Sequence, residues 1–443
     1  MSDIRTNEYA ARLSRIIQHE TVSSYDDTDL SKFYAFHEIL REQFPSLFSV
    51  CEFEDFNGSF LMRWRGADSS LLPMMLMNHH DVVEATGNWT YPPFSGTVAD
   101  GKVWGRGTLD TKGGLWGMLQ AADELCHEGF VPARDVYFLS ACCEETSGAG
   151  ADAISNALLE RGIRFSLVLD EGGMILDEPM NGAKSRFAMV GVGEKGYVDL
   201  KFTARSSGGH ASTPPKNTPL VRLGKFMAAA DKKNVFKVEM SDTVKATLRS
   251  FSTAMSGPIK PVLGHPTLFC PLLRRVMPSI SGTAAAMLRT TLAFTMAQGS
   301  QGPNVLPEEA YVIGNMRYSH HQGGEGSIKA IASLAAKYGI ETEVIHGGFD
   351  SPISSHESSA FKLIEEAVSA TFDGVKTAPY IMNAASDSRF LSRVCDNCLR
   401  FAPFTISKQQ LASVHGLDEC LDVDTLAPAV DFYRYVIMNS HTL

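Results

Sequence analysis

Acidic and histidine side chains occur in pairs just after three apolar segments of the chain. The pairs are His79 with Asp81, Glu144 with Glu145, and Asp170 with Glu171. Zinc takes imidazole and carboxylate ligands, and a bridged two-metal site needs about five protein groups, with one carboxylate shared between the ions. The pairs therefore predict a metal site, where a metal-activated water can serve as a nucleophile near neutral pH.

Members of one pair can have different roles. His79 and Asp81 are two residues apart at an expected strand end, so both side chains point to the same side, and Asp81 can orient a ligating His79. Glu144 and Glu145 are adjacent, so they point in different directions on an extended backbone. One can bind metal while the other moves a proton from water to a leaving amine. Taken alone, each pair also fits a structural histidine or an acidic loop.

A further carboxylate, Asp110, lies in the glycine-rich segment GRGTLDTKGG. Glycines let the backbone come close to an ion and to the start of the following helix, so a bridging carboxylate could be placed here. The alternative is an N-cap aspartate that opens the helix Lys112–His127.

The elements that must position these residues alternate between strand and helix. The evidence is apolar runs at Leu71–Met77, Val136–Cys143 and Phe165–Leu169, with a helical pattern at about 114–127. This alternation predicts a mostly parallel sheet flanked by helices, an α/β fold. In such sheets sites form outside the carboxyl ends of the strands, where the acidic and histidine pairs are expected.

A second pattern begins near residue 195. It comprises alternating segments at Tyr197–Ala204 and Ala310–Arg317, a helix at about 326–338 and a strand at Thr342–Ile345, and it indicates an inserted α+β domain. Between its halves, residues 231–300 contain five of the chain's prolines and a helical run at Ala284–Met296, and no role follows from them. The first pattern returns after about residue 350. We therefore expect a catalytic domain at 1–194 and 349–443, interrupted by a domain at 195–348.

Composition limits the classes of partner. The chain has 443 residues, more than one core usually holds, and a net charge of −10. Its basic residues are scattered along the sequence, which argues against nucleic acid or an anionic membrane as a partner. The first 20 residues lack the continuous apolar core of a signal peptide, and no apolar run approaches the roughly 18 residues of a membrane span. The predicted compartment is the cytoplasm.

Five motifs carry a resemblance to a known family. They are NHHDVVE, GRGTLDTKGG, EETSGAG, GGHASTPP and HGLDE, in this order. Together they resemble the co-catalytic zinc metallopeptidases that include aminoacylase, carboxypeptidase S, carboxypeptidase G, acetylornithine deacetylase and succinyl-diaminopimelate desuccinylase. The match spans nearly the whole chain, and LDEGG, EKG and the long insertion look most like the carboxypeptidase S branch. Asn78 and Glu84 replace a usual glycine and proline, and neither change removes a ligand.

This resemblance implies a phosphorylase/hydrolase-like catalytic domain with an inserted ferredoxin-like lid and dimerisation domain. It also implies two zinc ions per subunit, with Co²⁺ or Mn²⁺ as substitutes. The implied ligands are His79, Asp110 as the bridge, Glu145, His415, and either Glu171 or Asp170, of which Glu171 is preferred. Glu144 becomes the general base and Asp81 the orienting carboxylate.

Other positions are implied to contact substrate. His210 would reach the scissile carbonyl oxygen from a neighbouring subunit, which implies a homodimer formed through the inserted domain. Asn304 and Arg317 resemble lid positions that bind the substrate's carboxylate, and the SDSRF segment adds Arg389. Without the resemblance, His210 would be an exposed loop residue, Arg317 a solvated charge and Arg389 part of a structural ion pair.

The sequence thus predicts a zinc-dependent hydrolase. Cleavage of dipeptides or of C-terminal residues from short peptides ranks first, and deacylation of N-acyl amino acids second. A one-metal hydrolase and a catalytically silent scaffold protein are further alternatives, although the intact Glu144 argues against a scaffold.

Overall fold

The apolar runs of the sequence form the middle of a ten-stranded mixed sheet. Its strands are β1 (Glu52–Phe56), β2 (Ser59–Trp64), β3 (Met74–Met77), β6 (Val136–Ser140), β7 (Leu167–Asp170), β8 (Ile175–Asp177), β9 (Arg186–Glu194), β16 (Lys376–Met382), β17 (Cys398–Arg400) and β18 (Thr405–Ile406). The computed structural model describes residues 2–26, 28–232 and 235–443. It orders the strands β1-β2-β6-β3-β7-β17-β9-β8-β18, with β16 beside β9. The four strands β6, β3, β7 and β17 are mutually parallel.

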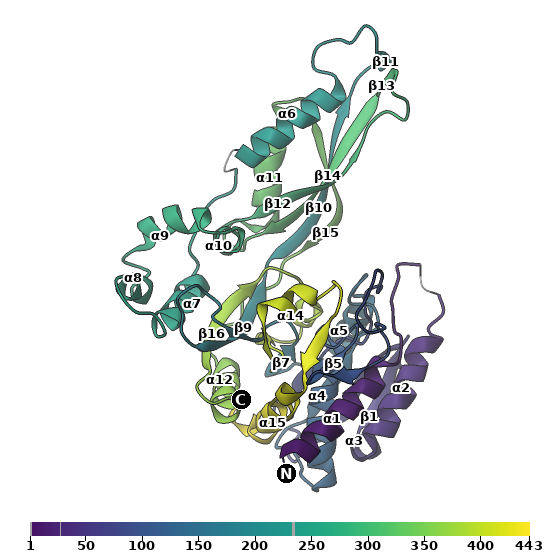
Figure 1. Cartoon of the computed structure of the whole chain (residues 1–443), viewed down its shortest axis with the longest axis vertical. Helices are drawn as coiled ribbons and strands as arrows, with labels where there is room; N and C mark the ends of the chain where they lie inside the picture. The colour runs from purple at the N-terminus through teal and green to yellow at the C-terminus, as the bar shows by residue number, and fades with distance from the viewer. Residues whose placement is uncertain (1, 27, 233–234) are drawn as a thin grey trace.

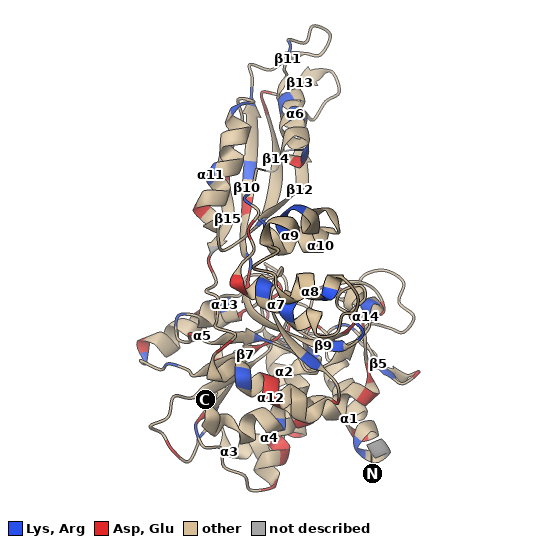
Figure 2. Ribbon diagram, turned by 90° about the vertical axis from the view of Figure 1, so that its left-hand side faces the viewer, with Lys and Arg blue, Asp and Glu red and all other residues tan. Residues whose placement is uncertain are grey.

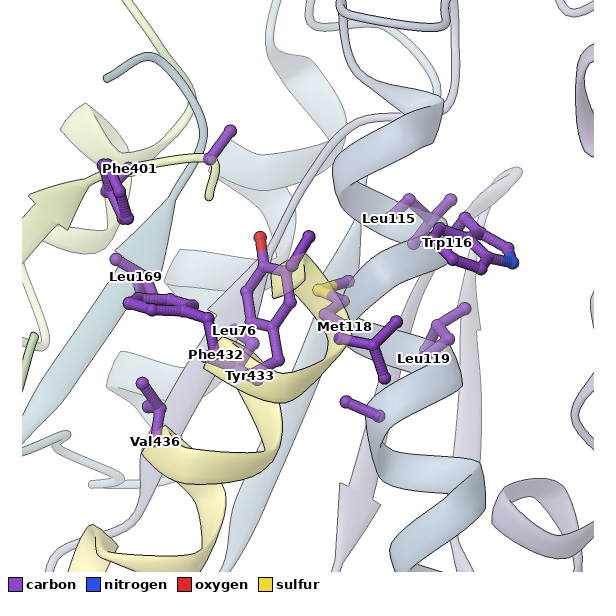
Figure 3. Packing of buried hydrophobic residues seen from close by; sticks show 14 of the residues in the cluster. Leu76, Leu115, Trp116, Met118, Leu119, Leu169, Phe401, Phe432, Tyr433 and Val436 are labelled. Atoms are coloured by element: carbon purple, nitrogen blue, oxygen red, sulfur yellow. The ribbon is translucent and has the colours of Figure 1, made fainter. Parts of the chain in front are cut away.

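Helices cover both faces of this sheet. Successive side chains of a strand point to opposite sides, so a strand made of apolar residues exposes apolar side chains on both faces that helices must bury. In β3, Met74 and Leu76 join one core cluster while Met75 and Met77 join another. The first cluster packs α1 (Ser2–Ile17), α2 (Ser31–Gln43), α3 (Pro45–Val50), α4 (Lys112–His127), α12 (Ser359–Thr371) and α15 (Leu426–Met438); the second packs α5 (Ala149–Glu160) and α13 (Ser388–Leu391). Figure 3 shows α4 and α15 packing side by side in the first cluster. The predicted α/β architecture is confirmed.

A second, antiparallel sheet stands above the first (Figure 1). It contains β10 (Gly196–Arg205), β12 (Thr291–Gln298), β14 (Glu309–Tyr318) and β15 (Glu341–Phe349), with helices α6 (Pro219–Lys232) and α11 (Gly323–Ala336). The element order is βαββαβ and the strand order is β12-β14-β10-β15, a ferredoxin-like arrangement. Both helices share one apolar core with β10 and β14. The expected inserted α+β unit is therefore confirmed, whereas its boundaries at 195 and 348 stay a proposal.

The proline-rich segment forms short helices that pack against the main sheet. They are α7 (Asp242–Ser252), α8 (Ile259–Gly264), α9 (Cys270–Val276) and α10 (Gly282–Leu288). Leu248 and Phe251 share a core cluster with Phe187 of β9 and Ala378 of β16. The predicted helical run Ala284–Met296 is wrong beyond Leu288, because pairing with β14 makes residues 291–298 a strand. None of the described helices has the length and apolar character needed to cross a membrane.

A buried ion pair lies where the chain passes between the two sheets. Glu194 ends β9 just before β10 begins, and its Oε2 lies 3.2 Å from Arg400 Nη2. Arg400 also donates to Ser351 Oγ (3.1 Å), which lies beside the returning crossover. Both charged side chains are almost fully buried. Arg400, on β17, therefore contacts both chain segments that connect the main sheet with the inserted unit.

We expect Arg400→Leu to lower the free energy of unfolding by about 3–5 kcal/mol, because it leaves Glu194 buried without its counter-charge. Urea titration followed by circular dichroism measures the change. The double variant Glu194→Met/Arg400→Leu should recover most of the loss. Arg161→Leu breaks an exposed pair with Glu54 and should cost only about 0–1 kcal/mol. A loss at Arg400 no larger than at Arg161 would contradict this.

Candidate metal centre

The predicted metal-binding residues meet at the carboxyl ends of three neighbouring strands. β6, β3 and β7 are adjacent and parallel, so the segments that follow them lie at one edge of the sheet. Asp110 comes from the loop before α4, and His415 from the loop after α14 (Lys408–Ser413). The structure brings together six predicted side chains: His79, Asp110, Glu144, Glu145, Glu171 and His415.

Asp110 lies between the two histidines. Its Oδ1 is 3.0 Å from His79 Nε2, and its Oδ2 is 3.0 Å from His415 Nε2. On one side Glu171 Oε1 lies 3.7 Å from His79 Nε2, and on the other Glu145 Oε2 lies 3.1 Å from His415 Nε2. Each histidine thus has a carboxylate of its own, and both share Asp110. This is the arrangement that a carboxylate-bridged pair of cations requires.

The charges of this donor set also fit two divalent cations. Four carboxylates share the space, and burial raises the pKa of Glu144, Glu145 and Glu171, with the charge of Asp110 raising the pKa of Glu145 and Glu171 further. The buried Glu145 Oε1 has no hydrogen-bond partner among the described residues. Buried charges of this kind are normally paired or coordinate metal. Two divalent ions would balance the charge of the four carboxylates, so the residues present fit a pair of bound divalent cations.

Asp81 positions both the histidine and the adjacent glutamates. Its Oδ1 lies 3.3 Å from His79 Nδ1, which also lies 2.9 Å from the Asp81 backbone oxygen. The two carboxylate oxygens accept the backbone N–H groups of Glu144 (3.1 Å) and Glu145 (3.2 Å). A proton held on Nδ1 leaves Nε2 of His79 free to bind metal. The sequence suggested the contact to His79, but not the contact to the Glu144–Glu145 turn.

Glu419 is a positioning residue that the sequence analysis missed. It is fully buried, and its Oε1 accepts the backbone N–H groups of Gly107 (3.1 Å), Leu109 (2.8 Å) and Asp110 (3.1 Å). Its Oε2 lies 2.6 Å from Arg106 Nη1. Glu419 therefore fixes the loop that presents Asp110. Its place at the end of the HGLDE motif was the available signal, but its partners lie over 300 residues away in sequence.

The structure distinguishes Asp170 from Glu171 by their partners. Asp170 is buried, and its two oxygens accept the backbone N–H groups of Glu171 (2.9 Å) and Ser388 (2.8 Å). Glu171 points its carboxylate towards His79 instead. The geometry therefore favours Glu171 as the ligand, while Asp170 holds the backbone of its neighbour and of the SDSRF segment.

Two of the predicted substrate-contacting residues lie far from this centre. His210 is exposed on β11 (Gly209–His210), which pairs with β13 (Val305–Leu306) at the far end of the inserted unit (Figure 1). The backbone oxygen of Asn304 accepts the N–H of Ala211 (3.0 Å), so Asn304 lies beside His210. Neither side chain can reach the metal-binding residues of its own chain in this conformation.

Arg317 and Arg389 lie nearer the main sheet. Arg317 is in β14, with its guanidinium carbon 4.5 Å from the centre of the Tyr197 ring. Arg389 follows Asp387, a buried carboxylate whose oxygens have no hydrogen-bond partner among the described residues. Burial raises the pKa of Asp387, and the charge of Arg389 opposes this increase. Asp387 in turn raises the pKa of Glu144, so this segment borders the candidate centre.

Comparisons with known proteins agree with this geometry. The model of Peptidase family M20/M25/M40 matches residues 75–439. The chain is 31% identical to probable carboxypeptidase S-like 2 of Dictyostelium discoideum, over 99% of this chain and 86% of that protein. It is 30% identical to N-fatty-acyl-amino acid synthase/hydrolase PM20D1 of Homo sapiens, over 97% of this chain and 87% of that protein. An M20 family metallo-carboxypeptidase from Sulfolobus solfataricus superposes with a TM-score of 0.72 at 16% identity, covering 97% and 99% of the two chains.

We expect Glu171→Gln to reduce bound zinc by about one ion per chain, since it weakens a charged ligand. Asp170→Asn should keep its zinc but lower the unfolding free energy by about 1–3 kcal/mol, because an amide oxygen can replace only one of the two carboxylate acceptors. Elemental analysis of dialysed protein and urea titration measure both. Metal loss in Asp170→Asn but not in Glu171→Gln would reverse the assignment.

Proposed function

Since the chain belongs to peptidase family M20/M25/M40 and is an enzyme of the metallopeptidase or amidohydrolase type, we propose that it hydrolyses dipeptides or removes C-terminal residues from short peptides. The observation that carries this proposal is Glu144. Its carboxylate adjoins a donor set for two cations, and its backbone N–H is held by Asp81. A protein that only binds metal does not need a carboxylate such as Glu144 beside its metal ligands.

The proposed ligands divide into two sets that share Asp110. His79 and Glu171 would hold one zinc ion, and His415 and Glu145 the other, with Co²⁺ or Mn²⁺ as substitutes. Bound there, zinc supplies Lewis-acid chemistry, which activates water and polarises a carbonyl group.

Glu144 would act as the general base and then as the general acid. Burial raises its pKa well above the ordinary value for a glutamate, as do the nearby carboxylates of Asp387, Glu145 and Asp81, while His79 opposes them. A carboxylate with a raised pKa can take a proton from the attacking water onto an Oε atom and deliver it to the leaving amide nitrogen. The hydrogen bond from the Glu144 backbone to Asp81 keeps this side chain in place.

Hydrolysis of N-acyl amino acids is the second candidate. The human N-fatty-acyl-amino acid synthase/hydrolase PM20D1 is 30% identical to this chain, and the carboxypeptidase S-like protein is 31% identical. Both reactions release an amino acid with a free carboxylate, which Arg389 or Arg317 would bind as a planar fork. Arg389 is the better placed, because it lies beside Asp387 at the border of the centre.

We further propose that the active form is a homodimer in which the inserted unit of one subunit covers the centre of the other. The position of His210 supports this, since it is exposed at the tip of the inserted unit and far from its own centre (Figure 1). Its imidazole would donate a hydrogen bond to the developing oxyanion. Asn304 beside it would contact the same substrate. The predicted compartment remains the cytoplasm.

The general-base assignment predicts that Glu144→Gln keeps both metal ions but loses about 10²–10⁴-fold in kcat. Release of free amino acid from dipeptides and from N-acetyl amino acids measures turnover, and the wild-type protein should act faster on dipeptides. Glu84→Gln, an exposed change in the neighbouring NHHDVVE segment, is the matched control and should keep full activity. Near-normal turnover in Glu144→Gln would exclude the assignment.

Sharing of the site between subunits predicts complementation. His210→Ala and Glu144→Gln proteins, each nearly inactive alone, should recover up to about a quarter of wild-type activity after subunit exchange, because some mixed dimers contain one intact site. Fluorescence energy transfer between labelled subunits confirms the exchange. If exchange occurs and activity does not return, His210 does not act across the interface.

A further inference from the structure

One segment of this acidic protein carries positive charge only. Residues 243–307 contain none of the chain's 50 Asp and Glu residues. They contain six basic residues: Lys245, Arg249, Lys260, Arg274, Arg275 and Arg289. Figure 2 shows Lys and Arg on α7, α8 and α9, which lie at one side of the molecule. Lys245 pairs with Asp242 just before the segment (2.8 Å), whereas no acidic residue lies within the segment itself.

The same segment exposes a row of large apolar side chains. Leu268, Leu272, Val276 and Ile280 are 74%, 52%, 44% and 65% exposed. They are spaced four residues apart, and backbone hydrogen bonds such as Leu273 N to Phe269 O (2.9 Å) keep the segment helical around α9. Leu272 and Val276 share one face of α9, whereas Leu268 and Ile280 lie in the turns before and after it.

This row does not contribute to the core. On the other side of the same segment, Leu273 and Met277 are buried in the cluster that packs on β9 and β16. The segment is therefore apolar on two faces, one turned to the protein and one to solvent. Exposed apolar patches with a polar rim mark interaction sites.

Two cations, Arg274 and Arg275, belong to the same helix as Leu272 and Val276, and a third, Lys260, belongs to α8; Arg274 donates to the backbone oxygen of Val238. Lys260, Arg274 and Arg275 are exposed, and among the described residues no carboxylate forms an ion pair with them. Ile259 adds another exposed apolar side chain beside Lys260. We call these eight residues the α8–α9 patch: Ile259, Lys260, Leu268, Leu272, Arg274, Arg275, Val276 and Ile280.

We propose that the α8–α9 patch docks the protein on a lipid bilayer with anionic headgroups. Leucine and isoleucine side chains can enter the boundary between headgroups and acyl chains, while Lys and Arg meet the phosphates and carboxylates there. Charge complementarity selects this partner, because the patch is purely cationic on a protein of net charge −10. The proposal departs from the expectation of no membrane partner, and it does not rest on the proposed reaction.

Vesicle flotation with the full chain tests the proposal. Wild-type protein should float with phosphatidylserine-rich vesicles at low salt, and much less with pure phosphatidylcholine vesicles or at high salt. Leu268→Ser/Leu272→Ser/Ile280→Ser should lower the partition coefficient at least about tenfold. Lys260→Gln/Arg275→Gln keeps the apolar row and should lower it about tenfold.

Matched controls separate this effect from general surface changes. Leu72→Ser/Val131→Ser/Leu159→Ser removes three apolar side chains of 53%, 57% and 50% exposure elsewhere, and Lys329→Gln/Lys362→Gln removes two exposed cations. Both control proteins should float like the wild type, and all variants should keep their hydrolytic activity in solution. Absence of wild-type flotation, or an equal loss in the controls, overturns the proposal. So does a patch variant that loses an oligomer in sedimentation velocity while it still floats, since the patch is then a subunit contact.

Discussion

The crowding of four carboxylates into one buried space is the constraint on which the rest of the candidate centre depends. Burial raises the pKa of Glu144, Glu145 and Glu171, and the charge of Asp110 raises the pKa of Glu145 and Glu171 further, so the protonated forms of these three glutamates are favoured unless cations lie beside them. The surrounding protein holds this repulsive set in place. Asp81 fixes the Glu144–Glu145 turn, and further buried carboxylates fix the neighbouring loops.

These supporting carboxylates all act in the same way. Asp81, Asp170 and Glu419 each accept backbone N–H groups of a residue that belongs to the centre. A carboxylate that accepts several N–H groups holds a loop more rigidly than a neutral acceptor does, because such bonds are shorter and stronger. The loops that follow β3, β6 and β7 can therefore present ligands without regular secondary structure of their own. The buried Glu194–Arg400 pair has a comparable role at the crossover to the inserted unit.

The sequence predicted those features of the fold and of the centre that depend on local residue patterns. Each of the three apolar runs overlaps a strand, although β6 ends at Ser140, three residues before its run ends, and the pairs that follow the runs meet because parallel neighbours share an edge. It preferred Glu171 to Asp170 but left both open, since the partner that engages Asp170, Ser388, lies more than 200 residues away. It also missed Glu419 for the same reason. The helix predicted through Met296 failed because tertiary pairing with β14 overrides local helical preference.

The central claim is that Asp110 bridges two metal ions, each completed by one histidine and one glutamate. Anomalous X-ray diffraction at the zinc absorption edge, from crystals of the zinc-loaded protein, tests it directly. The account predicts two peaks about 3.5–4 Å apart, one beside His79 and Glu171 and the other beside His415 and Glu145, with Asp110 between them. A single peak, or peaks away from Asp110, would contradict it.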